Sequence, residues 1–174
     1  MLRIYNPIPH RIKGDKIILP VKKRYNIKNN NNVKLDKNIL HTKNSLGFRG
    51  TEIPQNFSDY LSIIAVGGST TECFYLSDGD DWPSKLEIKL KEIYKNIVVQ
   101  NAGLDGHSTF AHKILIDDHI VKLKPKIILF LIGANDVGRD DLNKGFDTKI
   151  LKNYHNSFRE YIYEPVAKPP SRLG

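Results

Sequence analysis

Three short apolar runs, each followed by a loop that contains glycine, set the strongest limit on how this chain can fold. The runs cover residues 61–66, 97–99 and 126–132. Short apolar runs bounded by glycine are typical of buried parallel strands. Helix-like patterns separate them, at residues 81–94 and 109–123. Strands that alternate with helices predict right-handed β-α-β units and a single parallel sheet.

The predicted helices carry boundary signals of their own. Asp81 is a suitable N-cap, and Pro83 falls in the first turn, where its missing N–H costs little. Pro125 ends the second helix because proline removes a backbone donor. A last helix is expected over residues 148–164, and Pro165 would stop it.

The sequence before residue 61 has a different pattern of residues. Residues 1–60 are predicted to be an irregular or β-rich segment, and residues 61–174 an α/β domain. Proline recurs near the start and breaks any helix there, and residues 17–19 suggest a short strand. The run of four asparagines at residues 29–32 predicts a loop or hairpin tip.

The turn at residues 44–50 contains two glycines around an aromatic residue and an arginine. Tight turns of this kind direct neighbouring side chains to opposite sides, so we expect Phe48 to point inward and Arg49 outward. A substrate-facing loop is one interpretation of the turn. The sequence favours a packed connector.

The formal net charge of +8 is concentrated in residues 1–60. They hold 12 of the 27 Lys and Arg but only 4 of the 19 Asp and Glu, and the rest of the chain is balanced. A basic arm that binds nucleic acid would have this composition. The basic residues are mostly single and few aromatic residues alternate with them, which favours a solvated basic surface. No nucleic-acid partner is therefore expected.

Composition narrows the class of protein. A hydrophobic content of 40% and a charged content of 26% are typical of a globular domain. The single cysteine, Cys73, excludes an intramolecular disulfide and agrees with a reducing compartment. No apolar run is long enough for a membrane span, and no signal segment follows Met1. The cytoplasm is the expected location by default.

The loops after the three predicted strands carry the residues that point to chemistry. The first supplies Ser69, the second Gly103 and Gly106, and the third Asn135. Because parallel strands end at one edge of their sheet, these loops are expected to meet there. A hydroxyl nucleophile with nearby N–H donors suits acyl transfer. The alternative for Ser69 is a cap on the next helix.

The same three loops resemble the SGNH hydrolase superfamily, also called GDSL-type esterases. The first block is Val-Gly-Gly-Ser-Thr-Thr at residues 66–71, in which Gly68 replaces the commoner Asp. The second, Asn-Ala-Gly-Leu-Asp-Gly-His-Ser, covers residues 101–108. The third is Gly-Ala-Asn-Asp at residues 133–136. A Trp-Pro pair and the turn at residues 44–50 add to the likeness.

The resemblance implies a flavodoxin-like, three-layer α/β/α fold, usually with five parallel strands, of which three are expected here. It implies that Ser69 is the nucleophile. The backbone N–H groups of Ser69 and Gly106 and the side chain of Asn135 would form the oxyanion hole. Members of the family hydrolyse carboxylic esters and thioesters, often acetyl groups on carbohydrate, so the expected partner is a small or carbohydrate ester. No cofactor or metal is expected.

The last block of that family, Asp-x-x-His, does not occur in the sequence. Its histidine would accept the serine proton, so we expect a truncated form with little or no esterase activity. His107, beside Gly106, is the best substitute base, although such a loop histidine more often contacts substrate or solvent. His112 and His119 resemble a metal-binding face, but their spacing favours a solvated helix surface.

Other function classes stay open. A noncatalytic module could keep the oxyanion pocket and hold an acylated sugar or a small ester. A phosphate- or nucleotide-binding protein could use the Gly-Gly-Ser-Thr turn. The sequence has none of the glycine spacings that are usual in phosphate- or nucleotide-binding proteins. A function of that class would also leave Gly-Ala-Asn-Asp without a role.

Overall fold

The computed structural model describes residues 12–13, 16–17, 19–30 and 32–136. Contacts divide the chain into two units, Met1–Val137 and Gly138–Gly174. The second unit and the helix expected at residues 148–164 lie outside the described residues. The fold below is therefore that of the first unit.

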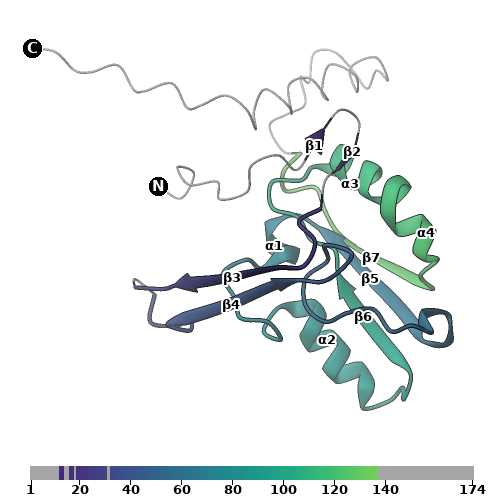
Figure 1. The fold of residues 1–174 in the computed structure, drawn as a ribbon, viewed down its shortest axis with the longest axis horizontal. Coiled ribbons are helices and arrows are strands. Elements are labelled where there is room, and N and C mark those ends of the chain that lie inside the picture. The colour runs from purple at the N-terminus through teal and green to yellow at the C-terminus, as the bar shows by residue number, and fades with distance from the viewer. Residues whose placement is uncertain (1–11, 14–15, 18, 31, 137–174) are drawn as a thin grey trace, which may run out of the picture. The chain divides into compact units, whose positions relative to one another are not determined.

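The centre of the unit is a three-stranded parallel sheet with the order β6-β5-β7 (Figure 1). The strands are β5 (Leu61–Gly67), β6 (Ile97–Asn101) and β7 (Ile127–Leu131). Each coincides with one of the apolar runs, so the predicted strands are confirmed. The middle strand is β5, and every residue from Ser62 to Gly67 in it is buried.

Helices follow the strands as the sequence predicts. They are α1 (Ser69–Glu72), α2 (Trp82–Lys91), α3 (Thr109–Leu115), a π-helical segment (Ile116–Ile120), α4 (Val121–Leu123) and a 3₁₀ turn (Phe57–Asp59). The N-cap of α2 is Asp81, whose side chain accepts a hydrogen bond from the Ser84 N–H. The helix expected at residues 109–123 is present, with the π-helical segment in its middle.

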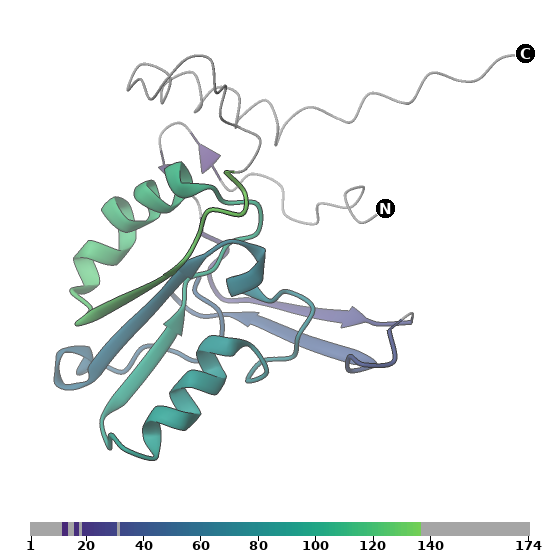
Figure 2. The same ribbon diagram turned by 180° about the vertical axis from the view of Figure 1, so that it is seen from behind.

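Helices lie on both sides of the sheet, with α2 beside β6 and α3–α4 beside β7 (Figures 1 and 2). Leu86 and Leu90 of α2 pack against a buried cluster of Ile63, Ile97 and Val99. Burial of these aliphatic side chains is the main stabilising contribution on that side, at about 1.5–3 kcal/mol for each fully buried one. The fold is α/β, with a parallel sheet between helices, as in the flavodoxin-like class.

The N-terminal part of the described chain is β-rich. It contains β1 (Ile12–Lys13), β2 (Lys16–Ile17), β3 (Lys23–Lys28) and β4 (Asn38–Lys43). Strands β3 and β4 form an antiparallel hairpin, and Asn29, Asn30 and Asn32 lie between the two strands, at its tip. After β4, the Arg49 N–H donates to the Asn101 carbonyl at the end of β6 with an N···O distance of 2.8 Å. The boundary at residue 60 stays a prediction.

Candidate functional site

Ser69 lies directly beyond the carboxyl end of β5. That strand ends at Gly67, Gly68 is the N-cap of α1, and Ser69 is the first residue of this helix. The side chain of Ser69 is exposed. Because Gly68 occupies the cap position, the interpretation of Ser69 as the helix cap is wrong. The hydroxyl is available at the edge of the sheet where parallel α/β folds bind ligands.

Asn135, in the loop after β7, lines the same small pocket as Ser69. The pocket has a volume of about 10 Å³, close to that of a site for one water. Its walls come from the end of β7 and from the segments that follow the three strands, at Gly68, Ser69, Thr70, His107, His112, Leu131, Ile132, Gly133, Ala134 and Asn135. Two of the expected site residues therefore meet in one cavity.

The carboxamide of Asn135 is held in place by the second loop. Its Nδ2 donates to the His107 carbonyl with an N···O distance of 3.0 Å. An asparagine amide carries two hydrogens, so a second N–H remains for another acceptor. The neighbouring Asp136 accepts hydrogen bonds from the backbone N–H and the hydroxyl of Thr109. These contacts attach the third loop to the start of α3.

Gly106 lies in a tight turn of the second loop. The His107 N–H donates to the Leu104 carbonyl at 3.2 Å, and Gly106 has a φ of +74°. A positive φ at the third position of such a turn defines the type II form, which requires glycine there. Gly106 is half-buried and is not among the pocket-lining residues, whereas the adjacent His107 is. Its expected role as an N–H donor stays a prediction.

His112, in the first turns of α3, lies inside the pocket rather than on a solvated helix surface. Its exposed fraction is 2%, and its ring centroid is 6.1 Å from that of the equally buried His107. The expectation of a wet surface for His112 is therefore wrong. Burial lowers the pKa of His112, and the smaller effects of the Gly67 carbonyl and the Asp136 carboxylate oppose this. The ring is neutral near pH 7 and can accept a proton.

Arg49 is buried, with 2% of its surface exposed, so the outward orientation expected for it is wrong. Its guanidinium donates to the carbonyls of Glu72 and Cys73, at 2.7 and 2.5 Å, and of Leu76, at 2.6 Å. Phe48 points inward as expected, with an exposed fraction of 1%. Arg49 therefore holds the segment that follows Ser69, and the turn at residues 44–50 is a packed connector.

A periodic signal in β4 could have revealed further polar residues near the site. Ile39, His41 and Lys43 alternate with less buried residues and face the interior. A period of two is the mark of one strand face. The apolar Ile39 at the start of the series indicates that His41 and Lys43 are buried as well. Lys43 lies in the basic part of the sequence, which was expected to form a solvated surface, so its burial was not predicted.

The described residues give no support for a metal site or for a membrane-spanning helix. Within the residues that the structure describes, no group of three or more His, Cys, Asp or Glu side chains could hold a metal ion. His119 is half-buried, and its Nε2 lies 3.3 Å from the Ile17 carbonyl. No helix in the described ranges is long and apolar enough to cross a membrane.

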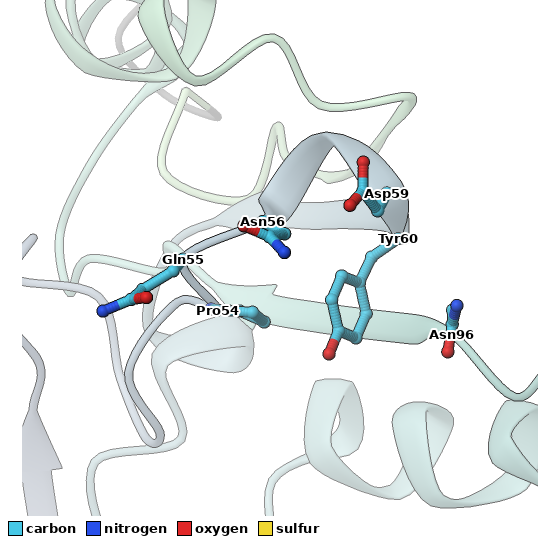
Figure 3. Close-up of a pocket in the computed structure, with 6 residues that line it drawn as sticks. All are labelled: Pro54, Gln55, Asn56, Asp59, Tyr60 and Asn96. Atoms are coloured by element: carbon cyan, nitrogen blue, oxygen red, sulfur yellow. The ribbon is translucent and has the colours of Figure 1, made fainter.

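A larger hollow, of about 410 Å³, lies at the other end of the sheet (Figure 3). It is lined by Pro54, Gln55, Asn56, Asp59, Tyr60 and Asn96. Tyr60 directly precedes β5 and Asn96 directly precedes β6, so this hollow adjoins the amino ends of the strands. Ligands of parallel α/β folds bind at the carboxyl ends. The smaller Ser69 pocket is the better candidate for chemistry.

Comparison with known proteins gives a limited likeness. No protein-family model matches the chain. No curated protein matches it either. Solved structures that match include an SGNH-hydrolase family esterase, AlinE4, and a mutant form of it, each at 25% identity over 57% of this chain with a TM-score of 0.40. Another mutant form of the same esterase matches with a TM-score of 0.38. The chain spans about half the length of these structures, at 51%.

Proposed function

We propose that the Ser69 pocket is the site of an SGNH-type serine ester hydrolase. The observation that carries this proposal is the common pocket of Ser69 and Asn135, which come from loops after different strands. The Asn135 amide is held by the His107 carbonyl, so its second N–H has a defined direction. A nucleophile beside a preorganised N–H donor is what acyl transfer requires.

In the proposed reaction, the Ser69 oxygen bonds to the acyl carbon of an ester and the carbonyl oxygen becomes an oxyanion. The backbone N–H groups of Ser69 and Gly106 and the second N–H of Asn135 donate to this oxygen. The bond from the acyl carbon to the alcohol oxygen then breaks and leaves an acyl-enzyme. Water attacks the acyl carbon in the same way, which releases a carboxylic acid and restores Ser69.

His112 is the proposed proton acceptor. It lines the pocket with Ser69 and is neutral near pH 7 because burial lowers its pKa. It takes the Ser69 proton, directly or through one water in the cavity, and returns it to the leaving alkoxide. Within the described residues neither ring nitrogen of His112 meets a hydrogen-bond partner, so no group takes the orienting part that a carboxylate has in a catalytic triad. In a triad enzyme, disabling the orienting carboxylate costs about 10⁴ in kcat, so turnover is expected to be slow.

The proposed substrate is an ester with a short acyl group, on a small alcohol or a carbohydrate. The cavity of about 10 Å³ has room for a group of the size of one water. An acetyl group requires less displacement of the walls than a longer chain does. Acetyl esters are therefore the first class to test.

Hydrolysis of p-nitrophenyl acetate tests the proposal. The expected result is slow turnover that Ser69→Ala abolishes, while Ser58→Ala, which removes an exposed hydroxyl in the 3₁₀ turn, leaves it unchanged. His112→Asn should lower kcat much more than His107→Asn, a matched change at an equally buried histidine. The wild-type rate should rise with pH through the lowered pKa of His112 and then level off, because only the neutral ring accepts a proton. Turnover that is insensitive to Ser69→Ala contradicts the hydrolase.

A noncatalytic binding module is the second candidate, and one observation favours it. The same burial that keeps His112 neutral also makes it a weaker base. Saturable binding of an acetylated sugar, lost in Asn135→Ala but without Ser69-dependent turnover, would support the module over the hydrolase.

A further inference from the structure

One buried carboxylate joins three separate parts of the chain behind the Ser69 pocket. Glu72, at the end of α1, has an exposed fraction of 0%, and Lys43 of β4 has one of 3%. The Lys43 Nζ lies 2.8 Å from Glu72 Oε1. The backbone N–H of Asp105, in the loop after β6, donates to Glu72 Oε2 with an N···O distance of 2.5 Å. We call these three groups the Glu72 link.

The Glu72 link connects the two loops that matter most for the proposed reaction. Glu72 belongs to the same single-turn helix as Ser69. Asp105 immediately precedes Gly106 in the type II turn. Any change in the position of Asp105 relative to α1 therefore changes the distance between the Ser69 hydroxyl and the Gly106 N–H.

We propose that Glu72, charged and held by Lys43, is a positioning residue that sets the Gly106 N–H relative to Ser69. Its effect on catalysis rests on the proposed function, but the link between the two loops does not. A carboxylate suits this role because one oxygen pairs with the Lys43 ammonium while the other accepts a hydrogen bond from the Asp105 N–H. Bonds of this kind, in which the acceptor is ionised, are stronger than bonds between neutral groups.

The neighbouring histidine does not act as a cation in the link. His41 Nε2 lies 4.0 Å from Glu72 Oε1. Burial, together with the charges of Lys43 and Arg49, lowers the pKa of His41 to about 3. His41 is therefore neutral near pH 7. Arg49 faces the same helix but donates to the Glu72 carbonyl rather than to the carboxylate.

Close packing makes the two loops sensitive to small displacements. A Cβ on Gly103 would lie 2.3 Å from the Glu72 backbone nitrogen and 2.6 Å from the Thr71 carbonyl carbon. The second loop thus rests directly on the backbone of α1. Asn101 Nδ2 also donates to the Thr71 carbonyl, at 2.7 Å. These contacts bring the loops together, and the Glu72 link acts on the residue next to Gly106.

The turn geometry provides a matched pair of variants. Asp105 occupies the second position of the type II turn, where proline is favoured. Asp105→Pro removes the N–H that Glu72 accepts, and its ring Cδ replaces that hydrogen and displaces Glu72 Oε2, which lies 2.5 Å from this nitrogen. Asp105→Ala removes the same exposed side chain but keeps the N–H. The two variants therefore differ in whether the second loop can bind Glu72.

The experiment measures kcat and KM for p-nitrophenyl acetate, the thermal unfolding midpoint, and the hydrogen exchange rate of the His107 amide, which closes the turn around Gly106 by donating to the Leu104 carbonyl. Asp105→Pro should lower kcat roughly tenfold or more with little change in KM, since complete loss of one oxyanion donor costs about 10²–10³. Exchange at the His107 amide should become faster. Asp105→Ala keeps the N–H that donates to Glu72, so it should lie closer to the wild type than Asp105→Pro in all three measurements.

A second pair of variants changes the acceptor, Glu72, instead of the donor. Lys43→Met/Glu72→Gln removes both charges but keeps an oxygen for the Asp105 N–H, whereas Lys43→Met/Glu72→Leu removes the acceptor. The proposal requires faster exchange at the His107 amide and a lower kcat in the leucine variant. Equal values in the two double variants, or a wild-type kcat in Asp105→Pro, would overturn it. If Ser69-dependent turnover is absent in the wild type, the proposed function fails, and exchange at the His107 amide still decides whether the link exists.

Discussion

Gly68 and Asn135 approach so closely that a Cβ on Gly68 would lie 2.7 Å from the Asn135 amide nitrogen. Real Cβ atoms essentially never come this near to another heavy atom. The carboxamide of Asn135 therefore explains the absence of a side chain at this position. The first loop, at Gly68, therefore packs closely against the third loop at Asn135, the proposed oxyanion donor.

Gly68→Ala should disturb the site with little effect on stability. The atom that it would meet is the far end of a side chain, which can move, so the thermal unfolding midpoint should change little. The displaced amide should lower kcat for p-nitrophenyl acetate roughly tenfold or more, as for a weakened oxyanion donor. Asn135→Ala should cause a similar loss, and the double variant should lose little more, because residues in contact act together. Additive losses would show that the two residues act separately.

Lys43→Met should strongly destabilise the fold. It leaves Glu72 buried with 0% exposure and without the Lys43 ammonium. Breaking a buried ion pair in this way typically costs about 3–5 kcal/mol. Urea denaturation at pH 7 measures the free energy of unfolding. Lys43→Met/Glu72→Gln should recover most of the loss because no uncompensated charge remains. A single variant as stable as the wild type would show that the pair does not stabilise the fold.

His41 should make the protein less stable as the pH falls. Burial lowers its pKa to about 3 in the folded state, against an ordinary value of 6.5. Between these two values the unfolded state binds more protons than the folded state, so stability rises with pH in that window and is lost as the pH falls through it. One proton corresponds to a slope of about 1.4 kcal/mol per pH unit.

His41→Phe provides the check on this pH dependence. The ring of His41 packs on Phe74 and Tyr25, with centroids 4.7 and 5.7 Å away, so a phenyl ring suits the cluster. The free energy of unfolding, measured by urea denaturation from pH 4 to pH 7, should depend less steeply on pH in this variant. An unchanged slope would assign the acid sensitivity to other groups, of which buried His112 is the first candidate.

The outer side of β7 should promote association between molecules. Within the described ranges, β7 pairs with β5 alone, and Phe130, Leu131 and Ile132 are 52%, 48% and 43% exposed. Exposed apolar edge strands favour edge-to-edge pairing, and a lysine there opposes it. Phe130→Lys should reduce concentration-dependent association in sedimentation velocity. Val33→Lys, a matched change at a fully exposed site near the hairpin tip, should not.

Local signals were sufficient for most of the fold. The strands β5, β6 and β7 follow from apolar runs that glycine-containing loops interrupt, and α2 begins where Asp81 can cap it. The edge that carries Ser69 and Asn135 follows from the parallel arrangement. These features depend on neighbours in the chain, so a periodic pattern or a cap is enough to predict them.

Local signals failed where a polar side chain finds distant partners. Arg49 resembles a surface residue in its own turn, but carbonyl groups that appear only when α1 folds beside it accept its hydrogen bonds. His112 sits in a helix with charged neighbours, yet it is buried and lines the same pocket as Ser69 and Asn135. In both cases burial is tolerated because of contacts between segments far apart in the sequence.

The amino-acid sequence by itself determined the parallel α/β architecture and the positions of Ser69, Gly106 and Asn135 at strand ends, because hydrophobic periodicity and glycine act locally. The tertiary structure alone decided which polar groups surround those residues. A buried charge such as Glu72 is stable only when a partner such as Lys43 lies within hydrogen-bond distance. Such pairing depends on how β4, α1 and the loop after β6 pack together, which no local pattern encodes.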